Sequence, residues 1–229
     1  MSDIVPIVYL MFTQSVKSFP IPSIQRLPVY LRFLKEQRNR GNELISCTQI
    51  AEEFGQLSVQ VRKDLAITGI SGRPKVGYRI NELIDAIESF LGWNREIKAF
   101  LIGAGSLGSA ILGYDGFVEH GLRIVAAFDI DPLKIGNHIH HCPVFDFQQM
   151  NGMGQNAGIE IGILTVPSVA AQEAANILVQ IGVQGIWNYT PMRLDIPQEI
   201  ICEEVKLSAS FAVLSSRLKK SPVFPDEYV

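Results

Sequence analysis

The glycines at positions 103, 105 and 108 form the pattern with the clearest chemical meaning in this 229-residue sequence. They follow an apolar segment, 97–102, with the composition of a buried strand, and they lead into an apolar helical segment. In that setting a Gly-x-Gly-x-x-Gly run forms a tight turn that lets the backbone approach a pyrophosphate at the helix amino terminus. The candidate phosphate contacts are Gly103, Ala104, Gly105, Ser106, Leu107 and Gly108.

Asp129 closes a second apolar segment, 124–128, and lies 21 residues beyond Gly108. A carboxylate at that position accepts hydrogen bonds from the adenosine ribose and repels a 2′-phosphate, which favours NAD(H) over NADP(H). The glycine run alone would be a weak signal. Together with its strand, its helix and the correctly spaced acid, it predicts a Rossmann-type NAD(H) site.

Two more strand-like segments follow, 159–166 and 185–189, separated by a predicted helix, 169–181, that Ser168 caps. In open parallel sheets the ligand crevice lies at the carboxyl ends of the strands. The residues expected to contact the nicotinamide half of the dinucleotide are therefore Thr165, Val166, Pro167 and Asn188.

The N-terminal third of the chain holds two short predicted helices joined by a tight turn. The first begins at Ser46, which forms a capping box with Gln49, and it ends at Gly55. The second covers 59–67 and is expected to be capped by Ser58. This arrangement predicts a helix-turn-helix, whose second helix enters the major groove of DNA.

The second of these helices has an apolar side and a polar side. Val59, Val61 and Leu65 are expected to pack inward, so that the polar residues face outward. Arginine reads guanine through two hydrogen bonds, glutamine reads adenine, and lysine neutralises a phosphate. The candidate DNA contacts on this helix are Ser58, Gln60, Arg62 and Lys63.

The flanking segments complete a winged helix. A first helix is predicted over 28–40, starting at a proline, and a last one over 81–92, capped by Asn81. The glycine-rich segment 69–78 predicts a two-stranded wing that could carry cations to the DNA backbone. The alternative reading is a small helical domain with a solvated basic face. The candidate wing contacts are Arg73 and Lys75.

Charge is distributed unevenly along a chain whose formal net charge is −3. Residues 26–79 hold ten Lys or Arg against five Asp or Glu, whereas the chain from Trp93 onward holds nine against fourteen. A basic block before an acidic body favours a polyanionic partner for the basic segment 26–79 alone.

No apolar stretch is long enough to span a membrane, and the opening 1–12 lacks the basic region of a signal peptide. The three cysteines suit a reducing cytoplasm.

With these elements in order, the sequence resembles the Rex family of redox-sensing repressors. The resemblance spans roughly residues 24–207 and is specific, because it joins this helix-turn-helix to this nucleotide fold. It implies a homodimer of paired Rossmann domains that binds a palindromic DNA operator when NADH is low and releases it when NADH binds. The segments that carry the resemblance are 26–32, 61–65, 103–108, 121–129, 131–136, 163–167 and 188–194.

The expected fold class is therefore α/β: an N-terminal winged helix, a Rossmann-type parallel sheet and a C-terminal helix that the resemblance implies is swapped between subunits. The predicted boundaries are a poorly anchored leader, 1–22, a winged-helix domain, 23–92, a Rossmann domain, 93–206, and the C-terminal helix and tail, 207–229.

The resemblance also implies a switch, and here the chain departs from the family. Arg26 and Tyr114 match an arginine and a tyrosine that alternately engage an aspartate before the swapped helix, and Tyr114 is also a candidate cofactor contact. This chain has Lys206 where that aspartate is expected. Either Glu203 or Glu204 has taken over the role, or the response to NADH is weakened. The wing departs as well, since 66–69 lacks the family's Tyr-Phe-Gly step.

The main alternative is an NAD-dependent oxidoreductase. That activity needs an acid–base group near the nicotinamide, but the four histidines lie between 120 and 141, and no substrate domain is expected after 205. We predict no catalytic residue.

A CoA-binding module is a second alternative, which Asp129 and the helix-turn-helix disfavour. The segment 138–142 has metal-ligand residue types, yet it is predicted to be a loop without a metal.

Overall fold

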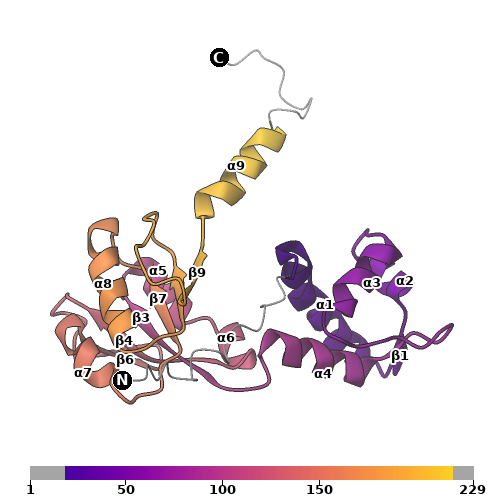
Figure 1. Cartoon of the computed structure of the whole chain (residues 1–229), viewed down its shortest axis with the longest axis horizontal. Helices are drawn as coiled ribbons and strands as arrows, with labels where there is room; N and C mark the ends of the chain where they lie inside the picture. The colour runs from indigo at the N-terminus through magenta and orange to yellow at the C-terminus, as the bar shows by residue number, and fades with distance from the viewer. Residues whose placement is uncertain (1–18, 219–229) are drawn as a thin grey trace, which may run out of the picture. The chain divides into compact units, whose positions relative to one another are not determined.

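The computed structural model describes residues 19–218 (Figure 1). Most of the predicted leader and the tail 219–229 lie outside the described residues. The chain divides into two units between Asn94 and Arg95, two residues beyond the predicted boundary. No helix within the described part of the chain is long and apolar enough to cross a membrane.

The N-terminal unit is a helical domain with one small sheet. Its core is built by apolar faces, as on α1, where Leu27, Leu31 and Leu34 repeat at helical spacing and are buried. Its elements are α1 (Ile21–Asn39), β1 (Leu44–Ile45), α2 (Cys47–Glu53), α3 (Ser58–Ala66), β2 (Tyr78–Arg79) and α4 (Ile80–Leu91).

The start of α1 differs from the prediction. The helix begins at Ile21 rather than at Pro28, with Pro20 as its N-cap and Pro22 in its first turn, a position that suits proline. Pro28 lies in the helix interior, where it cannot donate the usual backbone hydrogen bond. The helix continues through it because Leu27 before it and Tyr30 and Leu31 after it are anchored in the core.

One of the predicted helix caps is confirmed and three are wrong. The Ser46 hydroxyl accepts from the Gln49 N–H at 3.2 Å, and the Gln49 side chain accepts from the Ser46 N–H at 2.8 Å. Ser58, Asn81 and Ser168 instead lie inside their helices, because the extended backbone ends one or two residues earlier than expected. For α4 the cause is β2, which runs directly into the helix. The caps are Leu57, Arg79 and Pro167, none with a side-chain capping bond.

The wing is smaller than predicted. Within 69–78 there is a single bridge, Arg73 with Gly77, closed by a turn. The two-stranded sheet of this unit pairs β2 with β1 in antiparallel register, Ile45 opposite Tyr78. A two-residue strand such as β1 has no alternation pattern to detect, so the sequence did not indicate it.

The second unit contains a seven-stranded sheet in the order β5-β6-β4-β3-β7-β8-β9, parallel except for the β5–β6 hairpin. Phe100 and Ile102 of β3 belong to one apolar cluster and Ala99 and Leu101 to another, so this strand is buried on both faces, as in doubly wound folds. The strands are β3 (Ile97–Ile102), β4 (Leu122–Asp129), β5 (His138–Ile139), β6 (Cys142–Asp146), β7 (Ile161–Leu164), β8 (Gly185–Asn188) and β9 (Ile201–Glu204). The helices are α5 (Ser106–Leu112), α6 (Gly116–Glu119), η2 (Phe147–Gln149), α7 (Met150–Gly154), α8 (Ser168–Gln180) and α9 (Leu207–Leu218).

The expected α/β fold, with a helical N-terminal unit and a Rossmann-like parallel sheet, is confirmed. The edge strand β9 was not predicted. It pairs in parallel with β8 and carries Glu203 and Glu204. Its short, charged sequence lacks the apolar run of the central strands.

Candidate nucleotide and DNA sites

The loop between β3 and α5 can follow its path only because of its glycines. Gly103 has φ +95°, and a Cβ there would lie 2.9 Å from the Thr165 carbonyl carbon and oxygen. A Cβ on Gly108 would lie 2.1 Å from the Gly103 oxygen. A Cβ on Gly105 would meet nothing within 4 Å. Two glycines thus permit close packing and the third borders open space, which fits a pyrophosphate resting on the loop.

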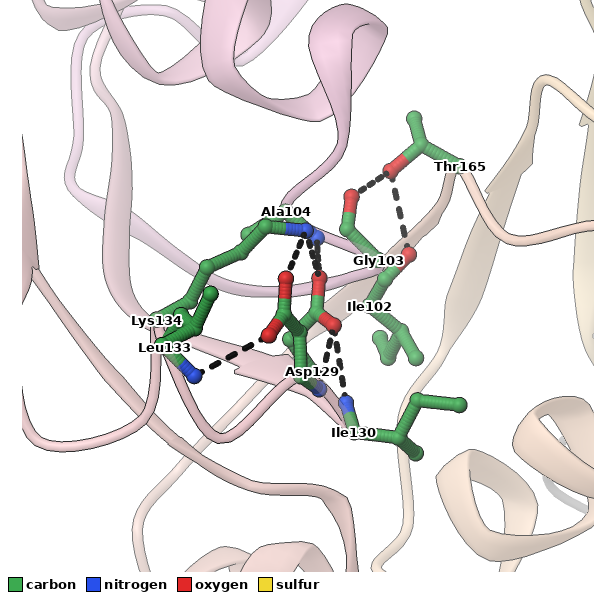
Figure 2. Close-up of polar contacts among 9 residues, drawn as sticks. Ile102, Gly103, Ala104, Asp129, Ile130, Leu133, Lys134 and Thr165 are labelled. Carbon is green, nitrogen blue, oxygen red and sulfur yellow. Dashed lines mark hydrogen bonds and ion pairs between the residues drawn. The ribbon is translucent and has the colours of Figure 1, made fainter.

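The same loop is braced from the neighbouring strand. The Thr165 hydroxyl, just after β7, lies 2.7 Å from the Gly103 carbonyl oxygen and 3.0 Å from that of Ile102, and donates to them (Figure 2). Thr165 therefore fixes the glycine loop, whatever else it contacts. Of its predicted partners at the nicotinamide half, Val166 is half-buried and Pro167 is exposed. Their contacts to the cofactor remain predictions.

Asp129 lies at the end of β4 with its carboxylate surrounded by donors (Figure 2). Oδ2 accepts from the Ala104 N–H at 2.8 Å and from Lys134 Nζ at 3.2 Å, while Oδ1 accepts from the N–H groups of Ile130 and Asp131 at 2.8 and 2.9 Å. Burial alone would raise the pKa of this carboxyl, but these hydrogen bonds outweigh it and lower the pKa. The contact of Asp129 with the ribose remains a prediction, and the sequence indicated neither its bond to the loop nor its contact with Lys134.

Asn188 and Tyr114 occupy contrasting positions. Asn188 is fully buried, and its amide oxygen accepts from the N–H and the hydroxyl of Thr190 at 2.9 and 2.7 Å. Its amide nitrogen donates to the Met192 carbonyl at 2.9 Å, so the side chain shapes the turn after β8. Tyr114 is exposed, with its ring 4.7 Å from that of Phe117. Both remain candidate cofactor contacts.

In the N-terminal unit, α3 presents Arg62 and Lys63 to solvent, as predicted. Val61 and Leu65 are buried, but Val59 is 58% exposed, so its predicted inward orientation is wrong. The inward position belongs to Asp64, which is fully buried. A helix turns 100° per residue, so the face centred on 61, 64 and 65 excludes 59.

Three of the predicted DNA contacts surround one hollow of about 680 Å³ between α2, α3 and the wing loop. Arg62, Arg73 and Lys75 line it, together with uncharged residues that include Thr48 and Tyr78. No carboxylate lies among the described residues of the lining. A cationic hollow without acidic groups suits the phosphate backbone of DNA. The sequence did not indicate Thr48 as part of this hollow, because Thr48 lies in the first helix of the predicted helix-turn-helix and the candidate contacts were sought on the second.

Asp64 organises a polar network that ties α3 to α1. Arg26 Nε and Nη2 donate to its two oxygens at 2.6 and 2.7 Å, and the Tyr30 hydroxyl donates at 2.9 Å. Gln60 Nε2 donates at 2.9 Å from the preceding turn of α3. Burial would raise the pKa of Asp64, but the hydrogen bonds, led by the one from Arg26, lower it.

The predicted switch residues are distributed over both units. Arg26 is bound to Asp64 within the N-terminal unit. In the second unit Lys206 pairs with Glu204, Nζ to Oε2, at 2.8 Å, and Glu203 is exposed. Tyr114 belongs to the second unit as well. The switch itself remains a prediction.

A helix-turn-helix unit with a cationic hollow and a Rossmann unit with a glycine loop define a DNA-binding regulator that responds to a dinucleotide. Two family models match: a putative DNA-binding protein N-terminus over residues 19–66, and a CoA binding domain over residues 94–192. The second covers part of the Rossmann-like sheet.

Relatives and solved structures agree with this class. The redox-sensing transcriptional repressor Rex of Treponema denticola is 52% identical over 193 residues, covering 84% of this chain and 92% of the relative. Rex of Bacteroides thetaiotaomicron is 40% identical, and the match covers 87% of this chain and 90% of that relative. The structure of RSP in complex with β-NAD⁺ and operator DNA matches with a TM-score of 0.83 at 34% identity. The match covers 89% of this chain and 94% of the RSP chain. RSP in complex with β-NADH matches with a TM-score of 0.78. The chain belongs to the Rex family of redox-sensing transcriptional repressors.

Proposed function

We propose that this protein is a transcriptional repressor that senses the ratio of NADH to NAD⁺, binding a palindromic operator when NADH is low and releasing it when NADH binds. The relatives are named redox-sensing repressors, and the solved RSP structures contain operator DNA, NAD⁺ and NADH. The observation that carries the proposal is the presence in one chain of the cationic hollow on the helix-turn-helix unit and the open glycine loop of the second unit.

The N-terminal unit supplies the DNA contacts in this proposal. Arg62 reads base edges from α3, while Lys63, Arg73 and Lys75 neutralise phosphates. Ser58 and Gln60 lie nearer the helix start and are half-buried. Gln60 already donates one amide hydrogen to Asp64, which leaves its second N–H and its oxygen for an adenine.

The glycine loop binds the dinucleotide pyrophosphate through its N–H groups, and the residues after β7 and β8 surround the nicotinamide. The bound cofactor supplies a change of charge, because reduction removes the positive charge of the nicotinamide ring. An apolar surrounding without a counter-anion then favours NADH, since burying an unpaired charge is costly. A shift from mostly bound to mostly free operator requires about 10⁴-fold differential affinity.

We further propose a homodimer that covers α9. The apolar side chains Phe211, Val213 and Leu214 of this helix are exposed in the single chain, Phe211 to 69%. A second copy that exchanges the helix would bury them, and a two-fold dimer matches a palindromic operator. A protein that acts on operator DNA works in the cytoplasm, where that DNA lies.

The proposed role needs no catalytic step, and the relatives are named repressors rather than enzymes. Three of the histidines, His138, His140 and His141, lie on or beside the β5–β6 hairpin, which β4 and β3 separate from β7 and β8 in the sheet. The oxidoreductase alternative predicts turnover of NADH with a small carbonyl substrate.

The test is a gel-shift titration on a palindromic operator with NAD⁺, with NADH and with neither. The proposal expects binding without nucleotide and with NAD⁺, and release by NADH. Operator binding that NADH does not change contradicts the sensor. Steady oxidation of NADH by the purified chain in the presence of a small carbonyl compound favours the enzyme.

A further inference from the structure

Lys134 lies in the loop after β4, between two carboxylates. Its Nζ is 3.2 Å from Asp129 Oδ2 (Figure 2). It is also 3.5 Å from Asp131 Oδ2. It is the only cation in the segment 129–136, and its exposed neighbour Leu133 is apolar. With one ammonium and two carboxylates, the segment 129–136 has a formal charge of −1, which would be −2 without Lys134.

The donors around Asp129 are of two kinds. An ionised carboxylate offers about four lone-pair positions, and all four are used here. Three of the donors are backbone N–H groups of Ala104, Ile130 and Asp131, which the fold holds in place. Of these four donors from the described residues, only Lys134 is a side chain, so it alone can move without a change of backbone.

Asp129 consequently anchors the glycine loop, whether or not a nucleotide is bound. Its side chain is only 10% exposed, and its bond to the Ala104 N–H joins β4 to the loop after β3. The charge that would repel a 2′-phosphate is offset by the adjacent ammonium. A bare carboxylate at this position discriminates against NADP(H) by repulsion, and this carboxylate is not bare.

We propose that Lys134 is a specificity-determining residue of the cofactor site, whose positive charge limits the preference for NADH over NADPH by attracting a 2′-phosphate. The proposal rests on the nucleotide site of the proposed function. A ribose hydroxyl at hydrogen-bond distance from Asp129 Oδ2 would have to share that oxygen with Lys134 or replace its bond. It would lie within roughly 6 Å of the position of Lys134 Nζ, given the 3.2 Å between the two protein atoms. At that range a cation and a phosphate still attract one another in physiological salt.

The experiment compares the dissociation constants for NADH and NADPH, by fluorescence titration of the full chain. The variants are Lys134→Met, which removes the charge, and Lys134→Arg, which retains it. Lys98→Met is the matched control, since it removes one lysine charge at the opposite end of β3 from the glycine loop. Because every nucleotide has the pyrophosphate, the ratio of the two constants isolates the 2′-phosphate.

Lys134→Met is expected to raise the ratio of the NADPH constant to the NADH constant about fivefold to tenfold. Lys134→Arg and Lys98→Met should leave this ratio within about twofold of wild type. An unchanged or lower ratio in Lys134→Met overturns the proposal, as does an equal rise in Lys134→Arg. If the methionine variant melts well below wild type without nucleotide, Lys134→Gln replaces it under the same criteria. Failure of the wild-type chain to bind NADH would contradict the proposed function instead.

Discussion

Each unit of this protein holds one aspartate whose two oxygens accept two hydrogen bonds apiece, yet the donors differ in kind. All four donors of Asp64 are side-chain groups, two of them from Arg26. Three of the four donors of Asp129 are backbone N–H groups. The first site depends on the identity of several side chains, whereas the second depends on the path of the chain. Substitution should therefore damage the DNA-binding unit more easily than the nucleotide site.

The largest effect is expected from Asp64→Asn. The amide cannot balance the charge of Arg26, and it presents an N–H₂ group where a second acceptor is needed. Removing one partner of a buried pair costs about 3–5 kcal/mol, and we expect about 2–3 kcal/mol because Arg26 is 26% exposed and can reach water. Urea unfolding followed by circular dichroism measures the loss. Operator affinity should fall with it, since α3 loses its attachment to α1.

Asp85→Asn is the matched control, because Asp85 is an exposed carboxylate of α4 in the same unit. It should change the free energy of unfolding by less than about 0.5 kcal/mol. If the two variants are equally stable, the Asp64 network contributes nothing and the comparison between the two sites fails.

Lowering the pH should weaken the same Asp64 network and so reduce the free energy of unfolding. The pKa of Asp64 is lowered in the folded chain, so its contribution to stability is complete above the unfolded pKa of about 4 and disappears as the pH falls through the folded value. We expect the wild-type free energy of unfolding to decrease below about pH 5. The decrease should be smaller in Asp64→Asn, and a parallel pH profile in the two proteins would contradict this linkage.

The contrast between the aspartates also explains what the sequence could predict. The sequence singled out Asp129 as a candidate because the glycine run, strand and acid form a local pattern with fixed spacing. The role of Asp64 was missed because its main partner, Arg26, is 38 residues away and neither residue type suggests burial. Because Asp64 was taken to face solvent, the inward face of the helix was assigned to Val59 instead. Lys134 was missed for a different reason: its contact depends on how the loop after β4 folds back, which spacing does not specify.

A third prediction separates DNA contact from stability within the N-terminal unit. Arg62→Ala and Lys63→Ala should each weaken operator binding by about 1–3 kcal/mol, and loss of a phosphate contact should reduce the salt slope by about one. Their stability and NADH affinity should match wild type, because both side chains are exposed. Arg123→Ala, an exposed arginine of the second unit, is the control. Unchanged operator affinity in both variants would place the DNA surface elsewhere.

Asp129→Asn tests the backbone-built site. The variant keeps one oxygen but presents an N–H₂ group to one pair of donors, so the glycine loop loses part of its anchor. We expect a loss of about 1–1.5 kcal/mol in NADH binding, close to tenfold, and a smaller effect on unfolding than in Asp64→Asn. Calorimetric titration with NADH provides the measurement, with Asp195→Asn as an exposed control. NADH affinity equal to that of the control would show that Asp129 neither anchors the loop nor contacts the cofactor.

The smallest effects are expected at the switch, where the charges are exposed. Lys206 and Glu204 pair at 2.8 Å on the surface, and such pairs contribute about 0–1 kcal/mol. Glu203→Gln, Glu204→Gln and Lys206→Asp should therefore leave stability almost unchanged. If the affinities for NADH and for the operator are also unchanged, a change in NADH-induced release reports the coupling between the two sites.

The resemblance to the family implies that an acid before α9 reports the bound nucleotide, and this chain has Lys206 at that position. Glu203 and Glu204 are the nearby carboxylates, and the pair with Lys206 already offsets the charge of Glu204. Successive side chains of a strand point to opposite faces, so only one of the two can replace the missing acid in a given contact. We predict that one glutamine variant, and not both, weakens NADH-induced operator release in the gel-shift titration. If both respond as wild type does, neither carboxylate serves as the trigger. If Lys206→Asp alone sharpens the response, the chain is a sensor with a weakened trigger, and the restored acid supplies the missing contact.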